Sequence, residues 1–201
     1  SYKSPSPSQG EDRGEVGGRT TAPEINFAKL LKMVDDIPGD FWLRYATSHP
    51  KDMSDKLIKA VAIGEKICPQ IYLPVQAGDN KVLKAMNRRY TAGHYRRLIK
   101  KIRRAVPEIS LTTDIIVGFP GETKQQFNNS LKLFREVKFD MAYISEYSAR
   151  PGTAAFKLAD NVPRQEKQRR KSQLDKVLRR TALANNKKYI GKTVRVLAEK
   201  E

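Results

Sequence analysis

Residues 110–122 read Ser110-Leu-Thr-Thr-Asp-Ile-Ile-Val-Gly-Phe-Pro-Gly-Glu122, and this stretch decides the fold. The run from Leu111 to Val117 is rich in β-branched residues and apolar on both faces, which is typical of a strand covered on both sides in a parallel sheet. Gly118-Phe-Pro-Gly121 ends the strand, because glycine frees the backbone and proline cannot extend a hydrogen-bonded ladder. Thr123 then begins a helical pattern in which Gln126 can complete a capping box. The stretch therefore predicts one strand–turn–helix unit.

A single charge interrupts this apolar strand, at Asp114. A carboxylate in apolar surroundings is costly unless a partner satisfies it. In parallel sheets with outer helices, ligands bind at the carboxyl ends of the strands. We therefore favour a ligand contact for Asp114; the alternative is an aspartate that caps its own turn.

The strand–turn–helix unit recurs along the chain. Strands are expected near residues 42, 71, 111 and 142, and the apolar spacing between them predicts helices. A long basic helix is expected from about Arg164 to Lys188. This alternation predicts an α/β fold with a parallel sheet and outer helices, either part of a (β/α) barrel or a doubly wound sheet. Four strands cannot close an eight-stranded barrel, so we expect the sheet to be open or incomplete.

The composition of the chain predicts three segments. Residues 1–23 are rich in Ser, Pro and Gly and are expected to form a flexible segment or an insertion. Residues 24–190 carry the alternating strands and helices of the main domain. Residues 191–201 begin with an alternating apolar pattern that has no visible hairpin partner, which indicates the first strand of a further, truncated domain.

Composition also limits the class of protein. With 39% hydrophobic residues and no long apolar run, the sequence contains neither a membrane span nor the apolar core of a signal peptide. Cys68 is the single cysteine, which excludes an internal disulfide and points to a reducing compartment. It also excludes a metal site built from several cysteines of this chain. We therefore expect a cytoplasmic protein with no membrane contact.

The net charge of +17 is concentrated in two segments. Residues 81–104 contain ten Lys or Arg and no acidic residue, and residues 163–188 contain ten Lys or Arg against Glu166 and Asp175. Such a distribution is expected of a surface that binds a polyanion. The alternative is two solvated helix faces without a partner. A membrane surface is disfavoured, because neither segment has the broad aromatic face of an interfacial helix.

Four separate motifs resemble those of the radical S-adenosylmethionine methylthiotransferases. They read Tyr72-Leu-Pro-Val-Gln-Ala-Gly78, Val82-Leu-Lys-Ala-Met-Asn-Arg-Arg-Tyr-Thr91, Thr113-Asp-Ile-Ile-Val-Gly-Phe-Pro-Gly-Glu-Thr123 and Tyr147-Ser-Ala-Arg-Pro-Gly-Thr-Ala154. Thr47-Ser-His-Pro50 and Leu73-Pro-Val-Gln76 are similar to the MiaB-type branch of this family, which modifies tRNA. The resemblance extends over roughly residues 25–198, and four motifs in the right order make it specific.

The resemblance implies a fold and an activity. The fold is a partial (β/α) barrel of the radical SAM type, here its back half, followed by the first strand of a C-terminal TRAM-like β-barrel. The activity is addition of a methylthio group to carbon 2 of an N(6)-isopentenylated adenosine beside the anticodon of tRNA. The implied cofactors are S-adenosylmethionine and, in the complete enzyme, two 4Fe-4S clusters. The implied partner is tRNA, bound by a monomer. The alternatives are the sister enzyme acting on threonylcarbamoyl-adenosine tRNA and a non-catalytic basic RNA-binding fragment.

Three residues match family positions near the cofactor. Gln76 matches a glutamine that faces the ribose, and Asp114 matches a carboxylate near the ribose hydroxyls. Arg88 matches an arginine near the methionine carboxylate, which suits bidentate pairing. The blander alternatives are a capping Gln76, a solvated Arg88 and a structural Asp114. The cations expected to contact RNA phosphates are Arg96, Arg97, Lys100, Lys101, Arg169, Arg170 and Lys171.

The chain departs from the family pattern at the cluster ligands. The cluster-binding CxxxCxxC motif is absent from the sequence, and Cys68 is interpreted as a core thiol. Because clusters of this kind are held by several thiolates, we expect no cluster and no activity from this chain alone. Tyr72 stands where the family usually has a histidine, which leaves the role of that position open. We interpret the chain as a fragment of a longer enzyme.

Overall fold

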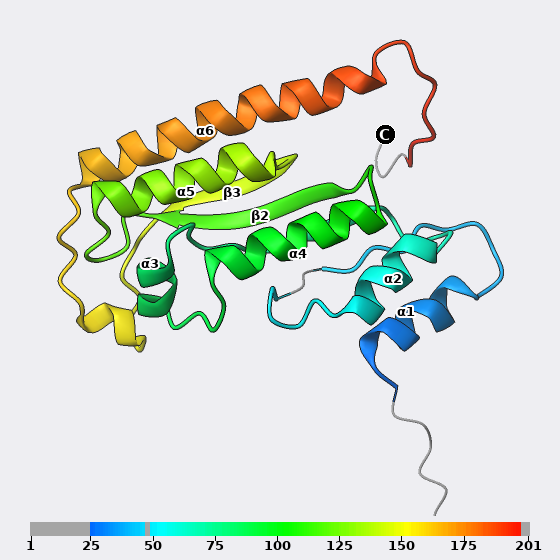
Figure 1. Ribbon diagram of the computed structural model, residues 1–201, viewed down its shortest axis with the longest axis horizontal. Helices are drawn as coiled ribbons and strands as arrows, with labels where there is room; N and C mark the ends of the chain where they lie inside the picture. Colours follow the sequence, from blue (N-terminus) through cyan, green and yellow to red (C-terminus); the bar gives the residue numbers. More distant parts are fainter. Residues whose placement is uncertain (1–24, 47–48, 198–201) are drawn as a thin grey trace, which may run out of the picture.

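The computed structural model of the protein describes residues 25–46 and 49–197 (Figure 1). Helices alternate with strands along this part of the chain, as expected. The main elements are α1 (Phe27–Asp35), α2 (Asp55–Ile63), β1 (Gln70–Tyr72), α3 (Asn80–Ala85), α4 (Ala92–Ala105), β2 (Ser110–Val117), α5 (Lys124–Val137), β3 (Met141–Glu146) and α6 (Arg164–Asn186). Two short 3-10 helices, η1 (Ala154–Lys157) and η2 (Lys187–Tyr189), flank α6.

The three strands form a parallel sheet in the order β1-β2-β3. The register pairs Tyr72 with Thr112, and Asp114 with Tyr143. The prediction of an α/β fold with a parallel sheet and outer helices is confirmed. The three described strands leave the sheet open, as expected for an incomplete barrel.

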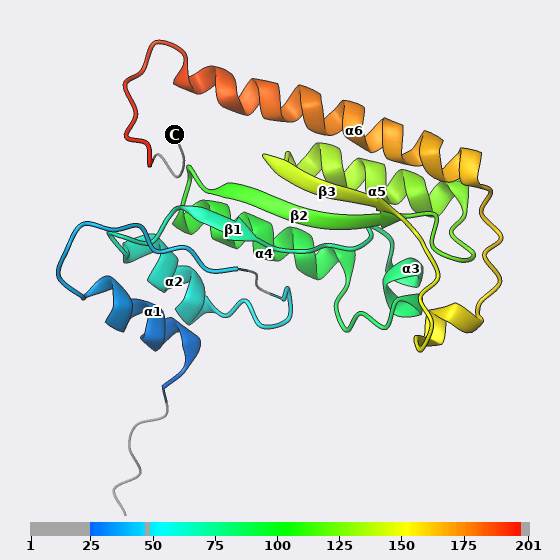
Figure 2. The same ribbon diagram turned by 180° about the vertical axis from the view of Figure 1, so that it is seen from behind.

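One face of the sheet carries the helices. Figures 1 and 2 show α4 and α5 packed on the same side of the strands, with α6 above α5. The large buried side chains of this layer include Tyr95 of α4, Phe127 of α5 and Leu174 of α6. The expectation that β2 is covered on both sides is therefore wrong for the described residues. On the open face of the sheet, Tyr143 is 55% exposed.

The strand expected near residue 42 is reduced to a single bridge. Within the described residues 41–46, only Leu43 forms a bridge, to Ile67. Cys68 N–H donates to the carbonyl of Leu43 at 3.0 Å, but the next N–H on that side, of Gln70, turns back to the carbonyl of Cys68 at 2.7 Å, so the pairing ends there. After Tyr72 the pairing of β1 with β2 is interrupted, because Val75 N–H donates to the hydroxyl of Thr113 at 3.0 Å, and parallel pairing resumes only at the bridge between Gln76 and Ile115.

The capping residues in the sequence match the helix ends in the structure. Thr123 and Gln126 form the expected capping box of α5, in which each side chain accepts a bond from the other residue's backbone N–H. Ser54 caps α2 by accepting from the N–H of Leu57 at 3.2 Å. The α5 helix ends at Lys138, which adopts a left-handed conformation with φ of 54°.

The predictions for the two terminal segments, residues 1–23 and 191–201, have different outcomes. Residues 1–23 lie outside the described residues. Residues 192–197, which are described, form no strand, although Arg195 pairs with Asp40 there. A lone strand has no partner to complete its ladder, so its pattern alone does not produce one. The assignment of residues 191–201 to a TRAM-like domain stays a prediction.

Candidate functional site

The carboxyl ends of the strands meet at one edge of the sheet, where the structure has a cavity of about 650 Å³. This is the edge at which parallel sheets with outer helices bind ligands. The lining comes from the segment after β1, the end of α3, β2 and the turn after it, and β3 with the loop that follows. The lining residues are Gln76, Ala85, Met86, Asn87, Arg88, Asp114, Ile115, Ile116, Phe119, Ser145, Glu146, Tyr147, Ser148, Arg150, Thr153, Ala154 and Ala155.

The three residues expected near a cofactor all line this cavity. Gln76 follows β1, Arg88 follows α3, and Asp114 lies in the middle of β2. They are separated by up to 38 positions in the sequence, and the βα units bring them together. The fold therefore assembles one amide, one guanidinium and one carboxylate around a single space.

Gln76 is held in a strained backbone conformation. Its φ is 61°, in the left-handed region that few side chains adopt. Two ladder bonds hold it there: its N–H donates to the carbonyl of Asp114 at 2.9 Å, and Ile116 N–H donates to its carbonyl at 3.0 Å. Among the described residues nothing bonds to its side-chain amide, which faces the cavity. Strain of this kind is concentrated at functional sites.

Arg88 is placed by the way in which α3 ends. Asn87 has φ of 56° and its N–H donates to the carbonyl of Lys84 at 3.0 Å. The N–H of Arg88 donates to the carbonyl of Leu83 at 2.8 Å, which completes a Schellman motif. This turn directs Arg88 to the cavity. No carboxylate of the described residues pairs with its guanidinium, which leaves it available to an anionic ligand.

Asp114 has a side-chain partner on the neighbouring strand. Its carboxylate forms a hydrogen bond with the hydroxyl of Tyr72, and the two residues lie on the same open face of the sheet. Burial, and after it the bond and the charge of Asp114, raise the pKa of Tyr72 to about 12. The alternative that Asp114 caps its own turn is not seen, since no described backbone N–H donates to its carboxylate. Tyr72 therefore orients Asp114.

Sequence reasoning missed several residues of the cavity. Glu146, at the end of β3, adds a second carboxylate. Phe119 and Tyr147 add aromatic rings whose centroids lie 5.1 Å apart in an edge-to-face arrangement. Tyr147 begins the fourth motif noted in the sequence, so its position was marked but its role was not. Glu146 carried no signal, because its place depends on the length of β3.

The turn after β2 is fastened to α6 by buried charges. The guanidinium of Arg170 binds the carboxylate of Glu122, whose other hydrogen bond comes from the N–H of Gly118 at 2.7 Å. Lys167 is also buried, and its ammonium donates to the carbonyl of Tyr147 at 3.2 Å. The expectation that Arg170 contacts RNA is therefore wrong, because its charge is enclosed and already paired. Arg170 and Lys167 instead hold the rim of the cavity.

The other cations expected to contact RNA lie on helix surfaces, and some of them have partners. On α4, Arg96 pairs with Glu136 at 2.5 Å, and Lys101 pairs with Asp55. On α6, Arg169 pairs with Glu166 at 2.6 Å and Lys171 is half-buried. The cations of this set that are both exposed and without a carboxylate partner among the described residues are Arg97 and Lys100.

The residues of this chain do not fit an iron–sulfur cluster. Cys68 is the single cysteine of the sequence, and it precedes β1, at the opposite end of the strand from the cavity. In residues 25–46 and 49–197, no three His, Cys, Asp or Glu side chains are grouped so that they could hold a metal ion. Across the same residues, no helix combines the length and the apolar character that a bilayer crossing requires.

Comparisons with known proteins show what the chain is similar to. The sequence model of the Radical SAM superfamily matches residues 15–134. The tRNA-2-methylthio-N(6)-dimethylallyladenosine synthase of Clostridium novyi is 46% identical over 182 residues, which are 90% of this chain and 40% of the relative. The enzyme of the same name from Desulfitobacterium hafniense is 48% identical over 174 residues, which are 87% of this chain and 39% of the relative. The chain thus spans about two fifths of the length of these relatives.

The fold also has a counterpart among solved structures. Coproporphyrinogen III oxidase from Escherichia coli, described as a radical SAM enzyme, superposes with a TM-score of 0.51 and 20% sequence identity. The superposition covers 71% of this chain and 31% of that chain. At this identity the likeness shows a shared fold and nothing about the substrate.

Proposed function

The chain belongs to the radical SAM superfamily, and from this premise we propose that its cavity binds S-adenosylmethionine as part of a tRNA methylthiotransferase. Members of the superfamily use S-adenosylmethionine together with a 4Fe-4S cluster. The observation that carries the proposal is the convergence of Gln76, Arg88 and Asp114 on one cavity at the carboxyl ends of the strands. The rest of the proposal follows from what these three groups can bind.

The groups of the cavity are complementary to those of S-adenosylmethionine. The Arg88 guanidinium can pair with the methionine carboxylate in a bidentate manner. The carboxylate of Asp114, oriented by Tyr72, can accept hydrogen bonds from the ribose hydroxyls. The free amide of Gln76 can bond to the same ribose, and Phe119 offers apolar surface for an aromatic base. These residues bind and orient the cofactor, which is the protein's share in reactions of this class.

Bound S-adenosylmethionine supplies the radical chemistry that an unactivated C–H bond at carbon 2 of adenine requires. The residues of this chain do not include the ligands of a cluster, so we assign it the binding and positioning of the nucleoside cofactor and not the reduction step. Such a division fits a chain that spans about two fifths of its curated relatives.

We propose tRNA as the substrate, with the reaction placed at carbon 2 of an N(6)-dimethylallyladenosine. The names of the relatives support this reaction. The charge supports an RNA partner, because the net value of +17 comes from the segments around α4 and α6. Arg97, Lys100 and Lys171 remain in the proposed set of phosphate contacts. We place the protein in the cytoplasm, as a monomer.

Titration calorimetry with S-adenosylmethionine tests the cavity. The full chain should bind the cofactor, and Arg88→Gln or Asp114→Asn should each weaken binding at least tenfold, since each removes one charged contact. Arg89→Gln is the matched control, because Arg89 is exposed, adjacent in sequence and outside the cavity lining. Equal affinity of all four proteins would contradict the proposal. Binding of tRNA without any binding of S-adenosylmethionine would instead identify a non-catalytic RNA-binding module.

Mass spectrometry of tRNA nucleosides tests the reaction. Cells in which the gene for this chain is disrupted should lose the 2-methylthio group from N(6)-dimethylallyladenosine and accumulate the unthiolated nucleoside. Loss of the methylthio group from threonylcarbamoyl-adenosine instead would assign the sister activity. A nucleoside profile identical to that of the parent cells would refute both assignments.

A further inference from the structure

We propose that the groove between α5 and α6 is a second contact surface for the phosphate backbone of RNA, separate from the cavity at the strand ends. The inference rests on the proposed function, because it takes tRNA as the occupant. It adds Arg135 and Lys138, which neither the motifs nor the two basic segments of the sequence identify, and it gives a role to Lys176 and Arg180 of the second basic segment.

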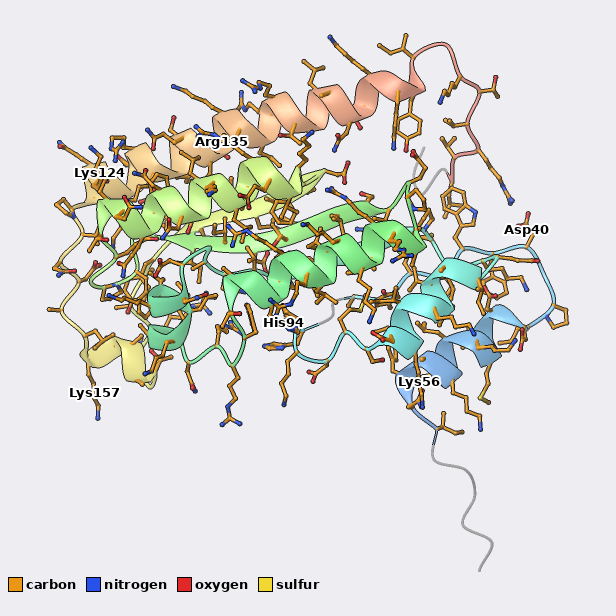
Figure 3. All side chains as sticks on the ribbon, viewed as in Figure 1. Asp40, Lys56, His94, Lys124, Arg135 and Lys157 are labelled. Atoms are coloured by element: carbon orange, nitrogen blue, oxygen red, sulfur yellow. The ribbon has the colours of Figure 1, made fainter. Side chains whose placement is uncertain are left out.

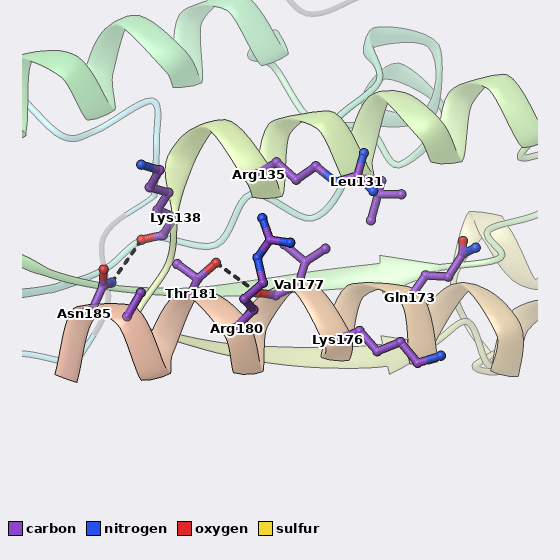
Figure 4. A pocket seen from close by; sticks show the side chains of 10 residues that line it. Leu131, Arg135, Lys138, Gln173, Lys176, Val177, Arg180, Thr181 and Asn185 are labelled. Carbon is purple, nitrogen blue, oxygen red and sulfur yellow. Dashed lines mark hydrogen bonds between the residues drawn. The ribbon is translucent and has the colours of Figure 1, made fainter. Parts of the chain in front are cut away.

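The groove has a volume of about 620 Å³ and runs along the second half of α5 (Figure 4). Leu131 and Val177 form part of an apolar floor, and Gln173 and Asn185 line the same space, with the amide of Asn185 bonded to Asp140 at 2.7 Å. Four cations line it: Arg135 and Lys138 from α5 and its end, and Lys176 and Arg180 from α6. No acidic residue is among its lining residues.

None of the four cations has a counter-ion among the described residues, a property that they share with Arg97 and Lys100 of α4. Within residues 25–46 and 49–197, no carboxylate lies within ion-pair distance of Arg135, Lys138, Lys176 or Arg180. Cations on α4 and α6 outside the groove are partly neutralised, as the pairs Arg96–Glu136 and Arg169–Glu166 show. A surface that keeps four uncompensated charges together across two helices favours a polyanionic partner.

The arrangement favours RNA over an acidic protein. Lys176 and Arg180 are one helical turn apart, about 6 Å along α6, and face Arg135 and Lys138 across the groove. Two such rows suit a regularly charged chain, and the amide of Gln173 and the apolar floor suit its sugars and bases.

The groove also lies within reach of an RNA that enters the cavity. α5 begins just after the Gly118–Gly121 turn at the cavity rim and has 14 residues, so it is about 21 Å long. At about 3.4 Å of rise per nucleotide, that distance corresponds to roughly six nucleotides. A tRNA with one adenosine at the rim of the cavity, beside the bound cofactor, therefore extends far enough for its backbone to lie against Arg135 and Lys138.

The test measures tRNA binding by the full chain as a function of salt. The groove variant carries Arg135→Gln, Lys138→Asn, Lys176→Gln and Arg180→Gln, with asparagine chosen at 138 because it tolerates the left-handed backbone there. The control variant removes the same charge at exposed lysines of α1, α2 and the loop before α2: Lys29, Lys51, Lys56 and Lys59, each changed to Gln. Figure 3 shows Lys56 and Arg135 well apart.

The probe is a fluorescein-labelled tRNA anticodon stem-loop, and circular dichroism melting curves check that both variants stay folded. Each phosphate contact contributes about 0.7–0.9 to the slope of log affinity against log salt, so losing four should flatten the slope by about 3. Affinity at 50 mM salt should fall at least tenfold in the groove variant. The control variant should keep the slope of the parent chain.

Three results would overturn the inference. One is a groove variant whose slope and affinity match those of the control variant while the parent chain binds tRNA, which leaves the proposed function intact. A second is a groove variant that binds tRNA as the parent chain does but no longer binds polyglutamate, which would assign the groove to an acidic protein. A third is a parent chain that binds no tRNA at low salt, which would remove the RNA substrate from the proposed function as well. The S-adenosylmethionine titration reports on the cavity independently of all three.

Discussion

The guanidinium of Arg170 lies 2.7 Å from the carboxylate of Glu122, in surroundings where the two side chains are 5% and 1% exposed. This pair joins α6 to the turn that follows β2, across 48 positions of sequence. The same arginine donates to the carbonyl of Glu122 at 3.0 Å, and Glu166 binds its Nε at 2.8 Å. Burial raises the pKa of Glu122, while Gly118 N–H and Arg170 oppose the rise. The long basic helix is thus part of the architecture of the cavity as well as a charged surface.

Replacing Arg170 should destabilise the fold strongly. Arg170→Met leaves the Glu122 carboxylate buried without its cation, which costs about 3–5 kcal/mol in free energy of unfolding. Arg169→Gln, one residue earlier and exposed, should cost no more than about 1 kcal/mol. Urea unfolding followed by circular dichroism measures both. Adding Glu122→Gln to Arg170→Met should recover part of the lost free energy of unfolding. Equal losses for Arg170→Met and Arg169→Gln would show that the buried pair contributes no more than an exposed one.

The two glycines of the turn should respond differently to alanine. Both have positive φ, of 71° at Gly118 and 78° at Gly121, so both substitutions carry a backbone cost of about 1–2 kcal/mol. A Cβ at Gly118 would lie 2.4 Å from Cγ of Lys167, whereas a Cβ at Gly121 meets nothing within 4 Å. Gly118→Ala should therefore destabilise clearly more than Gly121→Ala in thermal unfolding. Similar melting temperatures would mean that Lys167 moves aside freely.

Acid should remove an ion pair within the first turns of α6. The Arg169 hydrogen bond, with help from Arg170, lowers the pKa of Glu166 to about 2 from an ordinary value of 4.5. A carboxylate with a depressed pKa in the folded state stabilises the protein above its unfolded pKa, and this contribution is lost as pH falls towards 2. Between pH 5 and pH 3, the free energy of unfolding should drop more in the parent chain than in Glu166→Gln. Parallel curves for the two proteins would contradict the assigned pair.

The contact between Tyr72 and Asp114 can be tested by measuring the pKa of Tyr72. Burial is the main reason why the pKa of Tyr72 rises to about 12, and Asp114 contributes through its bond and its charge. Asp114→Asn keeps the burial and removes the charge, so the pKa should fall but stay above 10. NMR titration of 13C-labelled tyrosine from pH 9 to above pH 12 gives the comparison. An unchanged Tyr72 titration would show that the two side chains do not interact.

Local signals in the sequence predicted the βα units well. The capping box of α5 and the strand–turn–helix at residues 110–137 depend on neighbours in sequence, so the pattern alone identified them. Leu43 shows the limit of such reasoning. Its segment has the composition of a strand, yet pairing depends on the backbone of a different segment, where the N–H of Gln70 turns back to Cys68, and only one bridge forms.

In the candidate site too, some features could be predicted from the sequence and others depend on the fold. The family motifs marked Gln76, Arg88 and Asp114, but their convergence requires the sheet register and the Schellman turn after α3. Tyr72 meets Asp114 because β1 and β2 pair in parallel, which no local pattern reveals. Arg170 was misplaced because a run of cations does not show which of them the helix buries. Arg135 and Lys138 were missed because they belong to neither basic segment.

The most direct test of the central claim, that the cavity at the strand ends binds the nucleoside cofactor, is amide and methyl NMR of the labelled chain titrated with S-adenosylmethionine. We expect saturable shifts at Gln76, Arg88 and Ile116, with none at Val177 in the α5–α6 groove. Saturable shifts centred on the groove, or no shifts at millimolar cofactor, would contradict it.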